Sequence, residues 1–364
     1  MIVKSIELYD YRNYHQLKLP LDQGTNIFFG NNAQGKTNIL ESVFLSATTK
    51  SHKGSKDKDI IQFGKSEAHI RTIVDKKGSI YQIDIHLKKN KSKGIAINQV
   101  PIRKASDLFG ILNIVFFSPE DLNIIKSGPM ERRRFIDAEL CQLDKIYLSD
   151  LSNYNKILNQ RNRLLKDMYQ KPNLRDSLSV WNDQLINYGK KIILRRNNFI
   201  HEINGIVKLI HSQITNEKED IILRYEPNIG VDDFEKELSM GVERDIRLGQ
   251  TSIGPHRDDI RFEVNEVDIR KFGSQGQQRT CALSLKLAEI ELVKKITGDE
   301  PVLMLDDVLS ELDAERQNHL LNNIKSIQTL ISCTGLDEFI KNRFHINQIF
   351  EVIDGNVNTM SSGN

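Results

Sequence analysis

The sequence predicts an α/β protein in which strands of two kinds are combined with a long helical segment. Residues 67–103 alternate between apolar and polar side chains, as in AHIRTIV and YQIDIHL, which is the pattern of an antiparallel meander. The apolar runs at 111–117 and 301–307 are typical of strands buried on both faces. From Pro129 to about residue 215, apolar residues recur at helical spacing, which predicts a mostly helical lobe.

The elements are expected in a definite order along the chain. Strands at 2–8 and 25–29 precede a helix at 37–49, which the meander and the run at 111–117 follow. Gly128-Pro129 begins the helical lobe, and Lys171-Pro172 divides it into at least two long helices. Then come strands at 220–227 and 259–266, a helix at 281–296, the run at 301–307, a helix through 325 and strands at 329–334 and 348–354, with 357–364 frayed. These boundaries predict the segments 1–128, 129–218 and 219–364.

Length and composition narrow the class of protein. At 364 residues the chain exceeds the about 250–300 residues at which single cores stop growing, so two lobes are expected. Cys141, Cys281 and Cys333 are isolated and odd in number, which argues against a disulfide framework or a CxxC metal site. No apolar run approaches the about 20 residues that span a bilayer, and the N-terminus lacks a signal-like stretch. We therefore expect a cytoplasmic protein without a membrane partner.

Charge alone does not predict a nucleic-acid partner, because 51 Lys and Arg face 49 Asp and Glu. Basic residues nevertheless gather locally, and each cluster is either a solvated surface or part of a phosphate-binding face. The clusters are Lys50, His52, Lys53, Lys56 and Lys58; Lys88, Lys89, Lys91 and Lys93; and Arg132, Arg133 and Arg134.

A phosphate-binding loop is predicted at GNNAQGKT, between an apolar strand and an amphipathic helix. The stretch fits G-x-x-x-x-G-K-[ST], in which glycines let backbone N–H groups converge on phosphate oxygens at a helix start. Lys36 is expected to reach the terminal phosphates and Thr37 to ligate Mg²⁺. The alternative is an ordinary glycine turn. The predicted nucleotide-binding residues are Gly30, Asn31, Asn32, Ala33, Gln34, Gly35, Lys36 and Thr37.

Two aspartates end the apolar run PVLMLDD. A buried parallel strand delivers its last residues to the sheet edge where phosphate loops also lie. Asp306 then suits Mg²⁺, which prefers oxygen ligands, and Asp307 can polarise an attacking water. The alternative is a solvated strand end, which the phosphate loop makes less favourable. The turn SELD at 310–313 is expected to line a nucleotide-facing interface.

A second glycine-containing turn, GSQGQQRT, opens the helix after residue 274. Ser274 suits an N-cap, and N–H groups at a helix start attract anions, although a plain capped helix is the alternative. The order of loop, Ser-x-Gly-Gln turn, acidic strand and S-x-L-D resembles the ABC-type ATPases. In that family the signature turn closes on the γ-phosphate held by a second subunit. The resemblance implies that Ser274, Gly276 and Gln277 act in trans, and that two protomers enclose two ATP molecules.

The remaining motifs separate the branches of that superfamily. Transporter subunits place the signature close after the loop, follow the acidic strand with Glu and carry a switch His. Here a long segment separates Thr37 from Ser274, Asp307 replaces Glu, Thr334 is nearest to the switch position and His319 comes too early. SMC heads have a longer insertion with heptads, which this chain lacks.

Along essentially its whole length, the chain resembles the RecF family of bacterial DNA replication and repair proteins. The matching stretches are LYDYRNY, GNNAQGKTNILE, TKSHKGSKDKDII, FFSPEDLNIIKSGPMERRRFID, TSIGPHRDDI, SQGQQRTCALSLKLAEIEL and LMLDDVLSELD.

The resemblance implies an SMC-head-like ABC-type ATPase domain with an antiparallel β subdomain, a helical second lobe and no coiled-coil arm. It implies an ATP-dependent homodimer with slow ATP hydrolysis that binds duplex DNA near gaps and single/double-strand junctions. RecR, with RecO, and RecA loading are the implied partners and outcome. Catalytic roles carry over to Lys36, Asp307 and Ser274, and Mg²⁺ ligation to Thr37 and Asp306. Glu120 is expected in the metal-sensing loop and Arg12 near adenine, while His256 and Arg257 have no derived role.

Two other functions fit parts of the pattern. A transporter motor subunit predicts a membrane partner and no DNA affinity. A nucleotide-stabilised scaffold predicts ATP binding without turnover, against which Asp306 and Asp307 argue.

Overall fold

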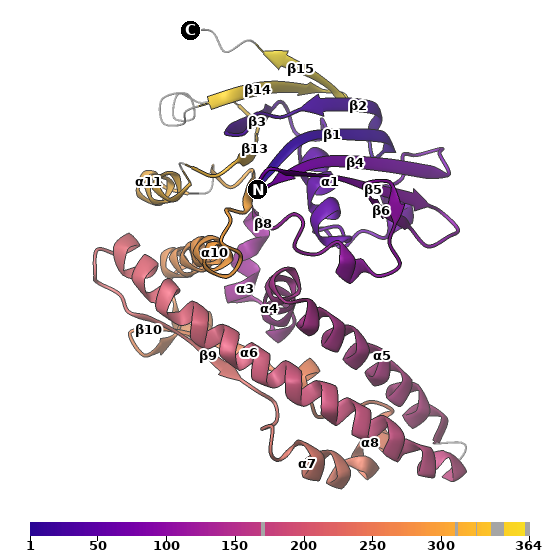
Figure 1. Ribbon diagram of the computed structural model, residues 1–364. Coiled ribbons are helices and arrows are strands. Elements are labelled where there is room, and N and C mark those ends of the chain that lie inside the picture. Colours follow the sequence, from indigo (N-terminus) through magenta and orange to yellow (C-terminus); the bar gives the residue numbers. More distant parts are fainter. Residues whose placement is uncertain (169–171, 310–311, 325, 336–345, 361–364) are drawn as a thin grey trace. The chain divides into compact units, whose positions relative to one another are not determined.

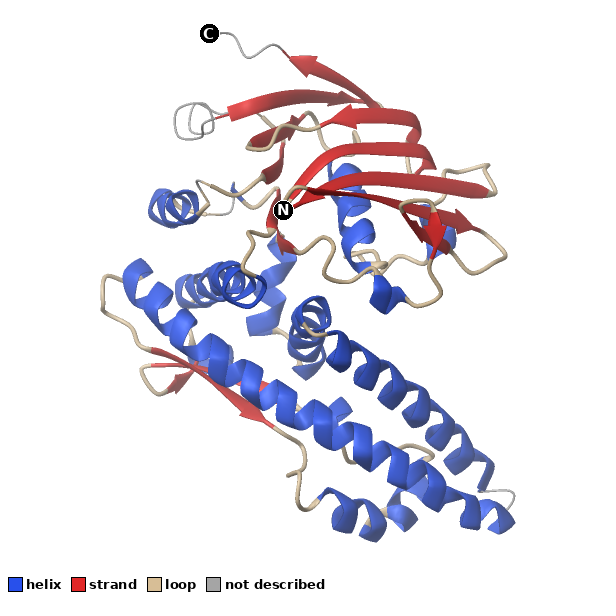
Figure 2. Cartoon of the chain, in the orientation of Figure 1, coloured by secondary structure: helices blue, strands red, loops and turns tan. Residues whose placement is uncertain are grey.

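The computed structural model describes residues 1–364 except 169–171, 310–311, 325, 336–345 and 361–364. The chain forms two compact units: unit 1 comprises Met1–Asp121 and Glu289–Asn364, and unit 2 comprises Leu122–Ala288. Strands dominate unit 1 and helices dominate unit 2 (Figure 2). The predicted three-segment division stays a prediction.

Unit 1 is built on two six-stranded sheets. One is antiparallel, in the order β2-β1-β4-β5-β6-β7, and the other, β15-β14-β3-β13-β12-β8, is parallel except for β15. The strands are β1 (Ile2–Tyr11), β2 (Tyr14–Pro20), β3 (Thr25–Phe29), β4 (Glu67–Lys76), β5 (Ser79–Lys88), β6 (Gly94–Ile97), β7 (Val100–Pro101), β8 (Ile114–Phe117), β12 (Val302–Asp306), β13 (Thr329–Cys333), β14 (Ile346–Ile353) and β15 (Asn356–Met360). The helices are α1 (Lys36–Thr48), α2 (Asp57–Ile60) and α11 (Ala314–Asn323).

The burial of each strand follows its sequence pattern. In β4 buried residues alternate with partly exposed ones, as the apolar–polar alternation predicts. All residues of β8, β12 and β13 are buried, which explains their continuous apolar runs. One hydrophobic core joins α1 to both sheets, and Ile6, Ile39, Ile70 and Phe28 within it are fully buried. This core sets the carboxyl ends of the parallel strands in fixed register.

Unit 2 is organised around two long helices, α5 (Lys145–Met168) and α6 (Leu178–Ile214), which lie side by side (Figure 1). The remaining helices are α3 (Leu122–Lys126), α4 (Pro129–Leu143), α7 (Phe234–Met240), α8 (Val242–Leu248) and α9 (Ile269–Phe272). A small antiparallel sheet contains β9 (Ile221–Glu226), β10 (Asp259–Val264) and β11 (Val267–Asp268). Helix α10 (Gln275–Thr297) begins in unit 2 and ends in unit 1.

A buried ion network connects the helices of unit 2 to the segment TSIGPHRDD. The guanidinium of Arg196 in α6 donates to Asp137 in α4 at 2.8 Å, to Asp258 at 2.9 Å and to the Pro255 carbonyl at 2.7 Å. His256 lies in the same segment, between the Tyr154 hydroxyl (2.7 Å) and the Thr251 carbonyl (3.0 Å). The polar residues of this segment therefore stabilise the helical unit.

Two strands of unit 1 were not expected from the sequence. Residues 14–20 form β2, the edge strand that pairs with β1. Residues 356–360 form β15 against β14, although 357–364 were predicted to fray. Both strands alternate weakly between apolar and polar side chains, because an edge strand needs little burial. Among the described residues, we find no helix long and apolar enough to cross a bilayer.

The pKa of His256 predicts a pH dependence of the stability of unit 2. Burial lowers this pKa from 6.5 to about 4, so the folded state binds the proton less readily than the unfolded chain. The stability is fully present above pH 6.5 and is lost as the pH falls from 6.5 towards 4, by roughly 3 kcal/mol at most. Urea unfolding followed by the fluorescence of Trp181, the one tryptophan, measures this loss.

His256→Gln is expected to flatten the profile between pH 6.5 and 4 relative to the unchanged protein. The carboxylates titrate in both proteins, so the difference between the two profiles reports His256 alone. His201→Gln, at an exposed position of α6, is the matched control and should leave the profile unaltered. Parallel profiles for His256→Gln and the unchanged protein would contradict the prediction.

Candidate functional site

The loop between β3 and α1 has a backbone that only glycine can follow at two positions. Gly30 has φ +149°, and a Cβ there would lie 2.3 Å from the Val352 carbonyl oxygen. Gly35 has φ +117°, and its Cβ would lie 2.6 Å from Asn13 Nδ2 and 2.7 Å from the Tyr14 hydroxyl. These two constraints are the structural reason for the glycines of the predicted phosphate-binding loop.

Residues at the β1–β2 and β14–β15 turns hold the loop in place. The Tyr14 hydroxyl donates to the Gly35 carbonyl at 3.0 Å, and the Asn13 amide donates to the Gln34 carbonyl at 2.8 Å. On the other side, the backbone N–H of Asp354, in the β14–β15 turn, donates to the Gln34 side chain at 2.5 Å. The loop is therefore fixed by both sheets of unit 1.

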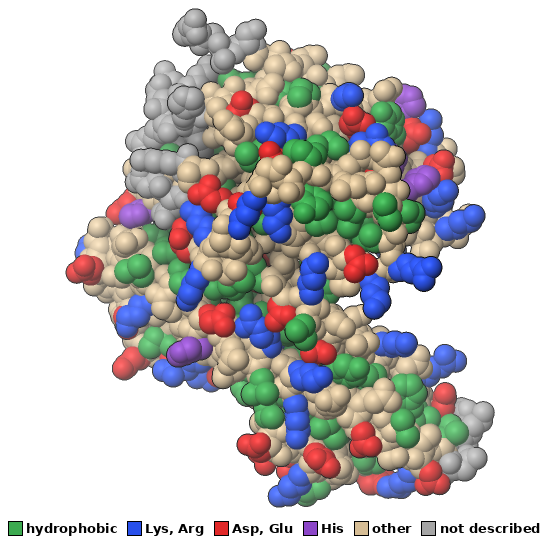
Figure 3. All heavy atoms as spheres, viewed as in Figure 1, with side chains coloured by type: hydrophobic (Ala, Val, Ile, Leu, Met, Phe, Trp, Pro, Cys, Tyr) green, Lys and Arg blue, Asp and Glu red, His purple; other side chains and the backbone are tan. Residues whose placement is uncertain are grey.

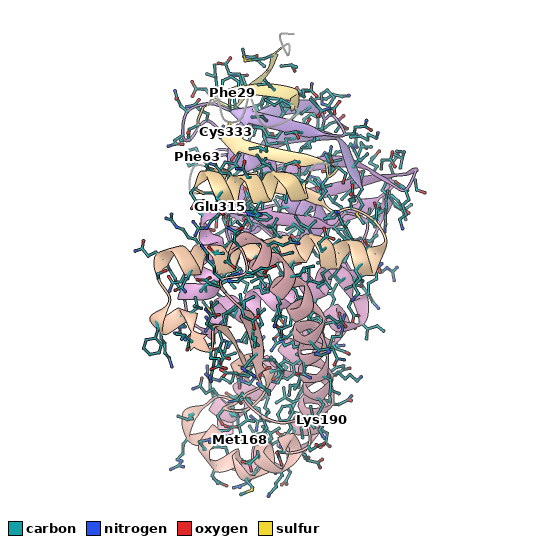
Figure 4. The ribbon with its side chains drawn as sticks, turned by 90° about the vertical axis from the view of Figure 1, so that its left-hand side faces the viewer. Phe29, Phe63, Met168, Lys190, Glu315 and Cys333 are labelled. Atoms are coloured by element: carbon teal, nitrogen blue, oxygen red, sulfur yellow. The ribbon has the colours of Figure 1, made fainter. Side chains whose placement is uncertain are left out.

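The loop and the acidic strand end meet at the carboxyl edge of the parallel sheet. Phe29 and Cys333, the last residues of β3 and β13, are register partners at this edge (Figure 4). The Thr37 hydroxyl donates to Asp306 Oδ1 at 2.8 Å, and the Ser332 hydroxyl donates to the same oxygen at 2.5 Å. The Lys36 ammonium is buried and donates to the carbonyls of Gly30 and Asn31 at 2.7 and 2.9 Å. The structure thus brings Lys36, Thr37 and Asp306 together.

Asp307 follows the strand in an unusual conformation. Its φ is +53°, in the left-handed region, and its backbone N–H points to Ser332, with 3.2 Å to both the hydroxyl and the carbonyl oxygen. Burial raises the pKa of its carboxyl, and the neighbouring Asp306 raises it further, while Lys36 opposes both effects. A carboxylate with a raised pKa is a stronger base, which suits an acceptor for the proton of an attacking water.

The geometry fits ATP and Mg²⁺. Helix α1 has Gly35 as its N-cap, with no side-chain cap and no acidic residue in its first turn, so its positive end suits an anion. The Thr37 hydroxyl and the Asp306 carboxylate, 2.8 Å apart, are the hard oxygen donors that Mg²⁺ prefers. Among the described residues there is no group of three His, Cys, Asp or Glu placed to hold a metal ion. The remaining Mg²⁺ ligands would then be phosphate oxygens and water.

A cavity of 480 Å³ lies beside the loop. The loop residues Gly30, Asn31 and Gln34 form part of its wall, and Thr334 and the end of β14 form another. Thr334, the sequence candidate for the switch position, therefore lines the same cavity as the loop.

The signature turn lies in unit 2 and forms a capping box. The Ser274 hydroxyl accepts from the backbone N–H of Gln277 at 3.2 Å, and the Gln277 side-chain carbonyl accepts from the backbone N–H of Ser274 at 3.0 Å. The other end of the Gln277 amide donates to Glu219 at 2.9 Å. Ser274 is exposed, as is Gly276, so the turn presents its first residues to solvent.

Other sequence candidates lie in different surroundings. Arg12 is bound within its own unit, to Glu41 of α1 at 2.7 and 2.8 Å and to Ser55 at 2.8 Å. Glu120 is exposed in the turn after β8, the strand beside β12. Their adenine and metal-sensing roles stay predictions. Of the turn SELD, residues 310 and 311 lie outside the described residues, and Asp313 caps α11 by accepting from the backbone N–H of Arg316.

The basic clusters separate into two kinds. Arg132 is buried against Asp259 at 2.6 Å, and Arg133 donates to the Asp258 carbonyl at 2.6 Å, so both stabilise unit 2. In unit 1, by contrast, Lys93 pairs with Asp57 at 2.9 Å and so links the two lysine clusters. The exposed lysines of this pair of segments are Lys50, Lys53, Lys56, Lys58, Lys89 and Lys91, which we call the lysine surface.

Sequence reasoning missed the residues that hold the site. Asn13, Tyr14, Ser332 and Glu219 each orient a motif residue from a distant part of the chain. Ser332 carried a usable signal, because it is a lone hydroxyl at the end of a buried apolar strand next to the acidic one. Asn13 and Tyr14 stand in the stretch LYDYRNY that matches the family, but no local pattern indicates their contacts with the loop, and none distinguishes Glu219.

Comparison with known proteins identifies the family and the fold of the chain. The family model described as the RecF/RecN/SMC N-terminal domain matches residues 2–353. The DNA replication and repair protein RecF of Agathobacter rectalis is 63% identical over 98% of this chain and 99% of that protein. That of Lachnospira eligens is 59% identical, over 98% and 99%.

Solved structures show the same fold. The recombination mediator protein RecF with ATP, of the RecFOR pathway, matches with a TM-score of 0.93 and 33% identity over 99% of this chain and 98% of that chain. The Smc head domain derived from Pyrococcus furiosus matches with a TM-score of 0.57 and 15% identity over 99% and 96%, which concerns the fold alone. The predicted SMC-head-like ABC-type ATPase fold is thus confirmed. The chain belongs to the RecF family of DNA replication and repair proteins.

Proposed function

We propose that the chain is an ATP-dependent DNA clamp that hydrolyses ATP slowly. The hydrogen bond between Thr37 and Asp306 carries the proposal, because it joins the loop and the acidic strand in one site. As the family resemblance implies, the clamp acts in the cytoplasm, binds duplex DNA near single-strand gaps and junctions, and works with RecR and RecO to load RecA.

Each site residue has one task in this proposal. The Lys36 ammonium exchanges its loop carbonyls for terminal phosphate oxygens. Thr37 and Asp306 would hold Mg²⁺, whose charge would offset that of the phosphates. Asp307 orients a water and accepts its proton as the water oxygen bonds to the γ-phosphorus and the bond to ADP breaks. The loop from Gly30 to Gly35 binds the phosphates through its backbone N–H groups.

Dimerisation completes the site. Ser274 and Gly276 of a second copy close on the γ-phosphate, as in the ABC-type ATPases. Their exposure is compatible with this role, because a buried turn could not reach another subunit. ATP thus acts as the contact that joins two protomers.

The lysine surface is the proposed DNA contact in unit 1. Acidic and basic side chains are interspersed on the face shown in Figure 3, without one continuous basic field. The total charge of +2 is also small. Closing two copies doubles the number of lysines that one duplex can meet, which makes the affinity depend on ATP.

Asp307→Asn is expected to lower the rate of ATP hydrolysis by about 10²–10⁴-fold and to retain ATP binding. Asn tolerates a left-handed backbone as Asp does, so the turn should keep its shape. Asp10→Asn, at a second left-handed aspartate (φ +46°) outside the site, is the control. Steady-state ATPase and fluorescent-ATP binding decide the outcome, and unimpaired turnover in Asp307→Asn would remove Asp307 from the mechanism.

A mixing experiment tests the shared site. Lys36→Met and Ser274→Arg protomers should each be inactive alone, but a heterodimer contains one site with both defects and one intact site. ATPase activity should therefore return on mixing. No recovery, with heterodimers demonstrated by differential tagging, is incompatible with a signature that acts in trans.

Charge reversal tests the lysine surface. Lys53→Glu with Lys89→Glu is expected to weaken ATP-dependent binding of gapped duplex DNA, and to reduce the salt slope by about one for each lost phosphate contact. Lys236→Glu, on the exposed face of α7, is the control. Binding titrations with and without ATP measure both effects, and an affinity that ATP leaves unchanged contradicts the clamp.

A further inference from the structure

We propose that Glu219 is a positioning residue for the signature turn, and that His211 at the end of α6 orients Glu219. The inference rests on the proposed function, because it concerns how the turn that acts in trans is held. Glu219 lies between α6 and β9, far in sequence from the turn that it contacts.

The Gln277 side chain is engaged at both ends within its own chain. Its carbonyl accepts from the Ser274 backbone N–H at 3.0 Å, and its amide donates to Glu219 Oε1 at 2.9 Å. A carboxamide is asymmetric, so an acceptor at one end decides which end faces the other partner. Glu219 thus selects the orientation in which Gln277 can cap Ser274, and Gln277 has an internal task besides any contact with ATP.

His211 fixes the carboxylate in turn. Its ring is fully buried; Nε2 lies 3.2 Å from Glu219 Oε2, and Nδ1 lies 3.0 Å from the Ser284 hydroxyl in α10. Burial lowers the pKa of His211, which favours the neutral ring. With its proton on Nε2 the ring donates to Glu219. The Ser284 hydroxyl near Nδ1 also lies 2.8 Å from the Thr280 carbonyl and has one proton for these two acceptors. Both oxygens of Glu219 then have a hydrogen-bond partner, which favours this orientation of the carboxylate.

The chain of contacts connects a long helix to the signature. His211 lies in the last turn of α6, which has 37 residues and extends over about 55 Å. It reaches α10 directly at Ser284 and, through Glu219, at Gln277 in the first turn of the same helix. A shift of the end of α6 therefore changes the geometry of Ser274 without touching the phosphate-binding loop.

Complementation of the full-length chain tests the assignment. Glu219→Ala should lower the ATPase of the homodimer by about tenfold, the scale of one lost hydrogen bond to a charged group, and retain ATP binding by each protomer. A mixture of Glu219→Ala and Lys36→Met protomers should regain activity, because their defects lie in different halves of the site. A mixture of Glu219→Ala and Ser274→Arg protomers should not, because both defects lie in the signature half. Asp220→Ala is the neighbouring control, because it removes an exposed pair with Lys208 and a carboxylate charge near His211 but leaves the hydrogen bonds of Glu219 in place.

Two further variants separate positioning from folding. Glu219→Gln keeps a carbonyl for the Gln277 amide and should retain most of the ATPase activity that Glu219→Ala loses. His211→Leu should behave like Ser274→Arg: it should recover ATPase activity when mixed with Lys36→Met, but not when mixed with Ser274→Arg. Full activity of Glu219→Ala, failure of Glu219→Gln to rescue, or recovery with Ser274→Arg each overturns the inference. If the mixture of Lys36→Met and Ser274→Arg recovers but that of Glu219→Ala and Lys36→Met does not, the inference alone fails. If neither recovers, the shared site itself is wrong.

Discussion

The steric constraint at Gly30 and Gly35 is the condition on which the site of unit 1 depends. A Cβ at Gly30 would lie 2.3 Å from a backbone carbonyl oxygen. A Cβ at Gly35 would lie 2.6 Å from Asn13 and 2.7 Å from Tyr14, so neither position has space for a side chain. The two sheets can approach the loop this closely only because Gly30 and Gly35 have no side chain. The same approach supplies the hydrogen bonds from Tyr14 and Asn13 that keep the loop in shape. The absence of side chains at Gly30 and Gly35 thus explains both the space for a phosphate and the rigidity of the loop.

The acidic strand end adds a second constraint to the first. Asp306 is held by hydroxyls from α1 and β13, while Asp307 turns into the left-handed region, at a cost of about 1 kcal/mol for a residue with a side chain. Successive side chains of a regular strand point to opposite faces, and the left-handed conformation of Asp307 ends that alternation directly after Asp306. One carboxylate is tied to the loop and the other is left with a raised pKa. Two aspartates of the same type can therefore serve different chemical tasks.

How much could be predicted from the sequence depends on whether the cause is local. The glycine loop, the alternation in β4 and the buried runs of β12 and β13 are local patterns, and the structure contains them where they were expected. Arg132 and Arg133 belonged to a basic cluster in the sequence, but their partners Asp258 and Asp259 lie more than a hundred residues away. No local pattern distinguishes a buried arginine from an exposed one, and the same holds for the roles of Asn13 and Glu219. The edge strand β15 was not predicted from the sequence, because pairing with β14, rather than burial of an apolar face, stabilises it.

The capping box changes the meaning of the signature turn in this chain. A plain N-cap needs only Ser274, but here Gln277 returns a hydrogen bond and is itself held by Glu219. Since the hydrogen bonds share atoms, loss of one partner loosens the others, and the turn behaves as a unit with the end of α6. The exposed hydroxyl that would meet a nucleotide is therefore set by residues of the helical unit, whereas the loop is set by the sheets of unit 1. Each half of the proposed composite site has its own supporting structure, so unit 2 can adjust the signature while the loop keeps its geometry.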